Sequence, residues 1–184
     1  MAPPIDPPPA ASPGLHELMV PGLEGAADIR CLVQVPPEYD PLRRYPAIVT
    51  LHSGMSTPLN QIEWWAGMPA ADGMRLGQAT RHGYVVIAPA WSEDHQSAYG
   101  YSPREHHAVL ASLREAVRRF SIDTDRVFLS GHSLGGDAAW DIALSHPDLW
   151  AGLVMIGPMA GRYVTHYWPN ARSLPIYAVA GELD

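Results

Sequence analysis

The sequence contains no lysine, a single cysteine and fewer basic than acidic residues. Its 12 basic residues are all arginines, and 19 acidic residues outnumber them, which gives a formal net charge of −7. A chain with this balance presents no strongly basic surface, so nucleic acid is not expected as a partner. Because Cys31 has no second cysteine to pair with, an internal disulfide and a cysteine-based zinc site are both excluded.

Long hydrophobic runs are also absent. The longest apolar stretches, such as Tyr84 to Ala90, are far shorter than the roughly 20 residues that a membrane-spanning helix needs. The N-terminus has no basic flank leading into an apolar segment, so no signal peptide is predicted and a cytoplasmic location is expected. With 47% hydrophobic and 17% charged residues, the chain has the composition of a folded globular protein.

Proline is concentrated at the start of the chain. Six of the first 13 residues are proline, a composition that favours an extended, solvated segment without helix or sheet. We therefore predict a disordered tail or linker over residues 1–13. The remaining residues, 14–184, have a length that suits one domain.

This domain alternates short apolar runs with helical segments. Ser102-Pro103-Arg104-Glu105 is a capping box that predicts a helix start, and Leu134–Ser145 predicts a buried helix. Strands that alternate with helices predict an α/β fold with a mostly parallel sheet covered on both faces, after an opening hairpin. The predicted strands are His16–Val20, Asp28–Val35, Ala47–Leu51, Tyr84–Ala88, Arg126–Ser130, Gly152–Ile156 and Ile176–Ala180.

One motif carries reactive chemistry. Gly131-His132-Ser133-Leu134-Gly135 is a Gly-x-Ser-x-Gly sequence between a predicted strand and a predicted helix. Glycines flank the serine because side chains would collide in so sharp a turn, and the strained turn raises the hydroxyl above the sheet edge. The helix that follows points its N-terminal amides at the same place, where they can stabilise an oxyanion.

At this motif the chain resembles the α/β-hydrolase family. Asp125 to Gly136 carries most of the likeness, and Tyr45-Pro46 leading into Leu51-His52, with Gly83 to Pro89, adds to it. The sequence is most similar to polyhydroxybutyrate-depolymerase-like and feruloyl-type esterases and to prolyl-oligopeptidase-like catalytic domains. The resemblance implies a three-layer sandwich around a mostly parallel sheet, and it implies that the last helix and strand of that fold are lacking after Asp184.

The resemblance also implies a set of site residues. Ser133 is the expected nucleophile, and the backbone N–H groups of Leu134 and Gly54 are the expected oxyanion donors. Because serine stands at position 53 where the family has glycine, Met55 is an alternative second donor. His52 is expected to be a buried structural histidine. Asp184 is the expected acid of the triad, with Glu182 as the alternative.

The histidine of the triad is not found where the family has it. Triad order in this fold is Ser, acid, His, and no histidine follows Asp184. Of the nine histidines present, only His166 is a candidate replacement base. We therefore expect an incomplete hydrolase that is nearly inactive as the 184-residue chain, with the strand at Ile176–Ala180 exposed as an apolar sheet edge.

Three functions remain open at this point. The first is a carboxylic-ester hydrolase that forms an acyl-enzyme on Ser133 and acts on a small-molecule ester, with no metal and no organic cofactor. The second is a prolyl-oligopeptidase-like serine peptidase, and the third is a non-catalytic hydrolase-like binding module. The sequence leaves the oligomeric state open. Aromatic side chains expected in loops near the site could line a substrate pocket: Trp64, Trp65, Trp91, Tyr99 and Tyr101.

Overall fold

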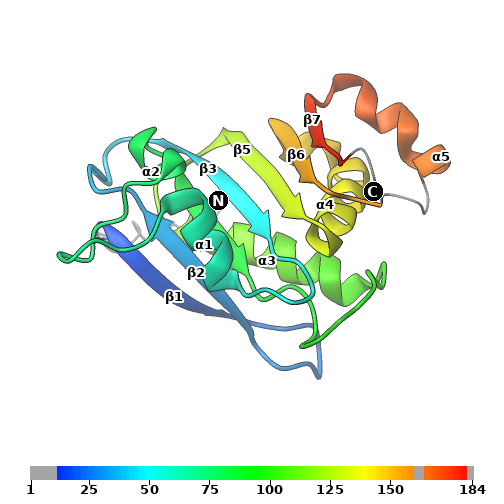
Figure 1. Cartoon of the computed structure of the whole chain (residues 1–184), viewed down its shortest axis with the longest axis horizontal. Helices are drawn as coiled ribbons and strands as arrows, with labels where there is room; N and C mark the ends of the chain where they lie inside the picture. Colours follow the sequence, from blue (N-terminus) through cyan, green and yellow to red (C-terminus); the bar gives the residue numbers. More distant parts are fainter. Residues whose placement is uncertain (1–11, 160–163, 182–184) are drawn as a thin grey trace, which may run out of the picture.

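The computed structural model describes residues 12–159 and 164–181, which form one sheet with helices on both faces (Figure 1). In these residues the strands lie in the order β1-β2-β4-β3-β5-β6-β7. The strands are β1 (Gly14–Val20), β2 (Ile29–Val35), β3 (Tyr45–Leu51), β4 (Val85–Pro89), β5 (Ile122–His132), β6 (Gly152–Ile156) and β7 (Ile176–Val179). The helices are α1 (Pro58–Ala66), α2 (Gln78–Arg81), α3 (Pro103–Arg119), α4 (Leu134–Ser145) and α5 (Val164–Tyr167), with 3₁₀ turns η1 (Pro147–Leu149) and η2 (Trp168–Ser173).

The seven predicted strands are all confirmed, and so is their arrangement. β1 and β2 form the predicted hairpin, with Gly14 opposite Val35 and Val20 opposite Ile29. β3 pairs in parallel with β4 and β5, and β6 and β7 continue the parallel sheet. Because the carboxyl ends of parallel strands meet at one edge, the loops after β3, β4, β5 and β6 gather there.

Helices cover the sheet on both faces because neighbouring strand residues point in opposite directions. Val49 of β3 faces α3 and α4, in a core that also contains Val109 and Ile142. Its neighbour Ile48 faces α1 and α2 in a second core, which includes Ile62. The predicted two-sided covering of the sheet is therefore confirmed.

The helix ends follow the predicted signals. The Ser102 hydroxyl accepts the Glu105 N–H at 3.3 Å, and the Glu105 carboxylate accepts the Ser102 N–H at 2.8 Å, so the capping box is formed at the start of α3. Pro103 occupies the first turn. The helix α4 has the predicted bounds and is buried along most of its length. No helix among the described residues is both long and apolar enough to cross a membrane.

The apolar edge predicted at the end of the sheet is present. β7 is the last strand of the described sheet and its residues are exposed, with Tyr177 at 67%. On the α1 side of the sheet, Phe128 and Val154 line a cavity of about 270 Å³ together with Trp65. The sheet therefore presents apolar side chains to solvent over β5, β6 and β7.

Candidate active site

Ser133 lies at the turn between β5 and α4, at the carboxyl edge of the sheet. Its backbone has φ 52° and ψ −118°, a conformation that residues with a side chain rarely adopt. The Ser133 N–H donates to the carbonyl oxygen of Ile156 on β6 at 2.7 Å, which fixes the turn against the neighbouring strand. Such a conformation costs about 1–3 kcal/mol, which the packing of β5, β6 and α4 offsets.

Glycines on both sides of Ser133 let this turn close. A Cβ at Gly131 would overlap the carbonyl oxygen of Gly135, and a Cβ at Gly135 would overlap the carbonyl oxygen of Leu51. These are backbone atoms of α4 and β3, so they cannot move aside without disturbing the elements that hold Ser133. The close approach of β3, β5 and α4 therefore requires glycine at both positions.

Leu134 and Gly54, the predicted oxyanion donors, lie against each other. A Cβ placed on Gly54 would be 3.2 Å from Cδ2 of Leu134 and would overlap the carbonyl oxygen of Gln96. Within the described residues, the backbone N–H groups of Leu134, Gly54 and Met55 have no hydrogen-bond acceptor. The loop after β3 thus brings unpaired backbone donors to the N-terminus of α4, beside Ser133.

His52 has the structural role that was predicted for it. Its side chain is buried, and Nδ1 lies 2.9 Å from the carbonyl oxygen of Ser53. Burial lowers the pKa of the imidazole, so the neutral form is favoured. The indole of Trp91 donates to the His52 carbonyl oxygen at 3.2 Å, which anchors the start of the loop that carries Gly54.

All nine histidines lie within the described residues, and no hydrogen bond joins any of them to the Ser133 hydroxyl. His132 points away and stacks on Trp64 with ring centroids 6.1 Å apart. The neighbouring side chains of His106 and His107 diverge, to Asp141 and to the Pro21 carbonyl oxygen. His166 is exposed on α5.

His146 is the C-terminal cap residue of α4. Burial and, to a lesser extent, the neighbouring His106 lower the pKa of His146, so the neutral form is favoured. The two rings meet edge to face with centroids 5.9 Å apart.

The two predicted acids, Asp184 and Glu182, lie outside the described residues. The strand before them is described. Val179 of β7 pairs with Ile156 of β6, and its carbonyl oxygen accepts the Gly157 N–H at 2.7 Å. Because β5, β6 and β7 run in parallel, the chain leaves β7 at the same edge of the sheet as Ser133.

Comparison with known proteins identifies the family to which a chain with this strand-to-helix turn belongs. The model of the Esterase family matches residues 26–173. The chain belongs to the Esterase family. It is also similar to dipeptidyl-peptidase 5 of Porphyromonas gingivalis, with 26% identity over 125 residues that cover 66% of this chain and 18% of that protein.

Solved structures show that this Esterase-family chain has the α/β-hydrolase fold, as its motifs predicted. A thermostable esterase superposes with a TM-score of 0.63 at 19% identity, covering 89% of this chain and 45% of that one. FphF, a fluorophosphonate-binding serine hydrolase of Staphylococcus aureus, superposes with a TM-score of 0.64 at 19% identity, covering 84% and 61%. The chain therefore spans less than two thirds of the length of each of these proteins.

The predicted aromatic loop residues have more varied positions than expected. Trp64 and Trp65 lie on α1 rather than in a loop, because Thr57 caps a helix that begins at Pro58. Trp91 and Tyr99 are buried in the core, with 0% and 7% of their surface exposed, so they do not line a substrate pocket. The loop position predicted for Trp64 and Trp65 and the pocket-lining role predicted for Trp91 and Tyr99 were therefore wrong, because apolar bulk alone does not distinguish helix, core and loop positions.

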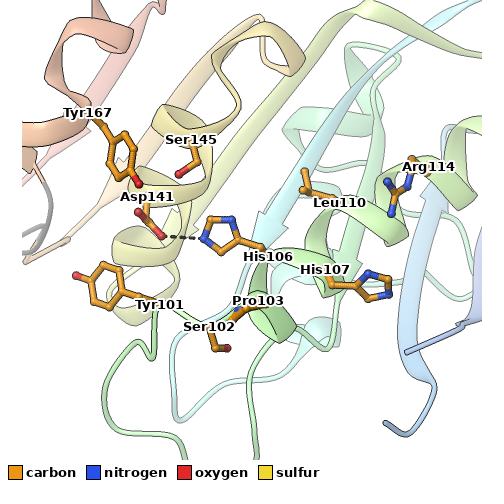
Figure 2. Close-up of a pocket in the computed structure, with 10 residues that line it drawn as sticks. All are labelled: Tyr101, Ser102, Pro103, His106, His107, Leu110, Arg114, Asp141, Ser145 and Tyr167. Carbon is orange, nitrogen blue, oxygen red and sulfur yellow. Dashed lines mark hydrogen bonds and ion pairs between the residues drawn. The ribbon is translucent and has the colours of Figure 1, made fainter. Parts of the chain in front are cut away.

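Two cavities open near the carboxyl edge of the sheet. One of about 510 Å³ is lined by Gly54, Met55 and Ser92, and the Ser92 hydroxyl is buried without a hydrogen-bond partner. The other, of about 660 Å³, lies between α3 and α4, where Nε2 of His106 donates to Oδ2 of Asp141 at 2.8 Å (Figure 2). Among the described residues, no three His, Cys, Asp or Glu side chains gather as a metal site.

Glu105 organises the loop between β4 and α3. Its buried carboxylate accepts hydrogen bonds from the Gln96 amide at 2.6 Å, the Gly100 N–H at 3.0 Å and the Ser102 N–H and hydroxyl at 2.8 and 2.7 Å. Burial opposes ionisation, but these donors outweigh it and lower the pKa of Glu105. Since the carbonyl of Gln96 packs on Gly54, the carboxylate also supports the loop after β3.

This carboxylate predicts a pH-dependent loss of stability. A carboxyl group with a lowered folded-state pKa stabilises the fold above its unfolded pKa, and that contribution is lost as the pH falls through the folded value. Glu105→Gln is therefore expected to lower the free energy of unfolding by about 1–3 kcal/mol at pH 7 and by much less near pH 3. Urea titrations at both pH values check this, with exposed Glu24→Gln as control; an equal loss at both pH values would contradict it.

Proposed function

We propose that this chain is part of a serine hydrolase that cleaves carboxylic esters through an acyl-enzyme on Ser133. The observation that supports this most is the strained Ser133 beside the unpaired N–H groups of Leu134 and Gly54. A hydroxyl held above a sheet edge, with two backbone donors next to it, suits attack on a carbonyl whose oxygen becomes negative.

The proposed reaction has two halves. The Ser133 oxygen attacks the ester carbonyl while a general base takes its proton, and the N–H groups of Leu134 and Gly54 stabilise the oxyanion. The alcohol leaves with that proton, and the acyl group stays on Ser133. Water then attacks the acyl-enzyme by the same route and releases the carboxylic acid. Asp184 is the proposed acid that orients the imidazole of the base.

The base is proposed to lie outside these 184 residues. No hydrogen bond joins a histidine of the chain to the Ser133 hydroxyl. Other groups contact the rings of His52, His106, His107 and His132. Without a base the serine stays a weak nucleophile. We therefore propose that the 184-residue chain is nearly inactive and that the complete reading frame supplies the missing histidine.

The test is hydrolysis of p-nitrophenyl acetate by both forms of the protein. The complete reading frame is expected to turn over the ester in a way that depends on Ser133, and the 184-residue chain to be slower by about 10⁴-fold or more. Esterase-like rates from the 184-residue chain would disprove the proposed location of the base. No Ser133-dependent turnover by the complete frame would favour a non-catalytic binding module.

A peptidase is the second candidate, favoured by the likeness to a dipeptidyl-peptidase. The two functions share the nucleophile and the oxyanion donors, so the residues described above suit either one. Comparing kcat/KM on p-nitrophenyl acetate with kcat/KM on dipeptidyl p-nitroanilides separates them. A peptidase would cleave the anilides in a Ser133-dependent way with the larger specificity constant, whereas the ester hydrolase is expected to leave them intact.

A further inference from the structure

A buried pair of aromatic residues connects the helix after Ser133 with the loop that carries Gly54. Trp91 and Tyr99 both follow β4, and their rings meet edge to face with centroids 6.0 Å apart. Neither residue is available to a substrate, since 0% of Trp91 and 7% of Tyr99 is exposed. The indole N–H of Trp91 and the hydroxyl of Tyr99 nevertheless each have a hydrogen-bond acceptor, and the two acceptors lie at opposite ends of the pair.

At one end the pair is fixed to α4. The Tyr99 hydroxyl donates to Oδ2 of Asp141 at 2.9 Å, and the same oxygen lies 2.8 Å from Nε2 of His106 on α3. Figure 2 shows Asp141 between the two helices, with the dashed contact to His106. The Asp141 side chain is buried, so a carboxylate held by these two donors resists displacement.

At the other end the pair holds the backbone of His52. The indole N–H of Trp91 donates to the His52 carbonyl oxygen at 3.2 Å, two residues before Gly54. That carbonyl also packs on the turn at Ser133, because a Cβ at Gly135 would lie 2.7 Å from it. The peptide bond between His52 and Ser53 is therefore held in one orientation. A small rotation of this peptide would change the direction of the N–H groups that follow, including that of Gly54.

Other buried tryptophans show that this hydrogen bond is not a general feature of the core. The indole N–H groups of Trp140 and Trp150 are also buried, but they have no hydrogen-bond partner among the described residues. Packing thus accounts for those two side chains by itself. Trp91 differs because its N–H is directed at one backbone carbonyl next to the proposed oxyanion donor.

We propose that Trp91 and Tyr99, anchored by Asp141, are positioning residues that align the Gly54 N–H with Ser133. This inference rests on the proposed function. The pair touches no reacting atom and acts through the His52 carbonyl. Its loss should therefore weaken stabilisation of the transition state while substrate binding stays nearly unchanged, which gives a lower kcat at a similar KM.

The experiment compares Trp91→Phe and Tyr99→Phe with Trp150→Phe as the matched control. In the complete reading frame, the first two are expected to lower kcat for p-nitrophenyl acetate about 10-fold or more, with KM changed less than about 3-fold. This is less than the roughly 10²-fold cost of deleting an oxyanion donor. Trp150→Phe is expected to leave both constants within about 2-fold, because it removes an N–H without a partner.

Hydrogen exchange of the Ser56 and Thr57 N–H groups in the 184-residue chain gives a readout that does not depend on turnover, because in this loop they donate to the Ser53 carbonyl oxygen and to Oδ1 of Asn60. Faster exchange there in Trp91→Phe and Tyr99→Phe, but not in Trp150→Phe, supports the inference, and Tyr99→Phe keeps the ring in case Trp91→Phe fails to fold. Unchanged exchange in both variants, or an equal effect of the control, overturns it. Absence of Ser133-dependent turnover would instead count against the proposed function alone.

Discussion

Ser133→Ala is expected to lower kcat for p-nitrophenyl acetate in the complete reading frame by about 10⁶-fold. The substitution removes the oxygen that would bond to the acyl carbon, and loss of the nucleophile in a serine hydrolase has about this cost. It corresponds to about 8 kcal/mol of transition-state stabilisation, since each factor of ten is about 1.4 kcal/mol. Initial rates over a range of ester concentrations give the measurement.

The fold of this variant should be preserved. Alanine keeps the Cβ of serine and adds no bulk, and the Ser133 contact to Ile156 uses the N–H, which alanine retains. Melting temperatures within about 2 °C of each other would therefore show that only chemistry has been lost. Ser97→Ala, in the exposed loop after β4, is the matched control and should keep full activity. Esterase rates in Ser133→Ala would rule out the proposed nucleophile.

Gly135→Ala is expected to give a large loss of stability. The new Cβ would overlap the Leu51 carbonyl oxygen and lie 2.7 Å from that of His52, so α4 must move away from β3. Forcing extra atoms into a close-packed interior typically costs about 1–3 kcal/mol, and contacts with rigid backbone belong at the upper end. Urea unfolding followed by circular dichroism measures the change.

Gly136→Ala is the matched control for this prediction. It lies one residue further along the same helix, and its Cβ would come no closer than 3.2 Å to any atom, the nearest being the Cβ of Pro158. Alanine is favoured over glycine in a helix by about 1 kcal/mol, which offsets a small adjustment of that side chain. The control should therefore stay within about 1 kcal/mol of the parent. A Gly135→Ala variant as stable as Gly136→Ala would show that α4 is not held against β3.

The local signals in the sequence were sufficient for the fold and for the strained turn at Ser133. Buried parallel strands read as short apolar runs because both of their faces pack, so all seven could be located. The start of α3 followed from the capping box, in which Ser102 and Glu105 satisfy each other's backbone donors. The sharp turn at Ser133 could be predicted because it needs glycines at fixed spacing, and that requirement is visible in five consecutive residues.

The aromatic residues show what such signals cannot decide. Trp91 follows β4 much as an active-site loop residue would, yet it is fully buried and bonded to a carbonyl 39 positions away in the chain. Trp64 and Trp65 lie on α1, where Trp65 donates to the Thr50 hydroxyl at 3.1 Å. Whether an aromatic side chain lies in the core, on a helix or in a loop depends on which distant elements pack on it.

The sequence by itself determined the order of strands and helices, the turn at Ser133 and the net negative charge, because each depends on neighbouring residues or on composition. Only the tertiary structure decided that Gly54 lies on Leu134, that no histidine hydrogen-bonds to the Ser133 hydroxyl, and that Asp141 joins Tyr99 to α4. These contacts join residues dozens of positions apart, and they form because parallel strands bring their carboxyl ends to one edge.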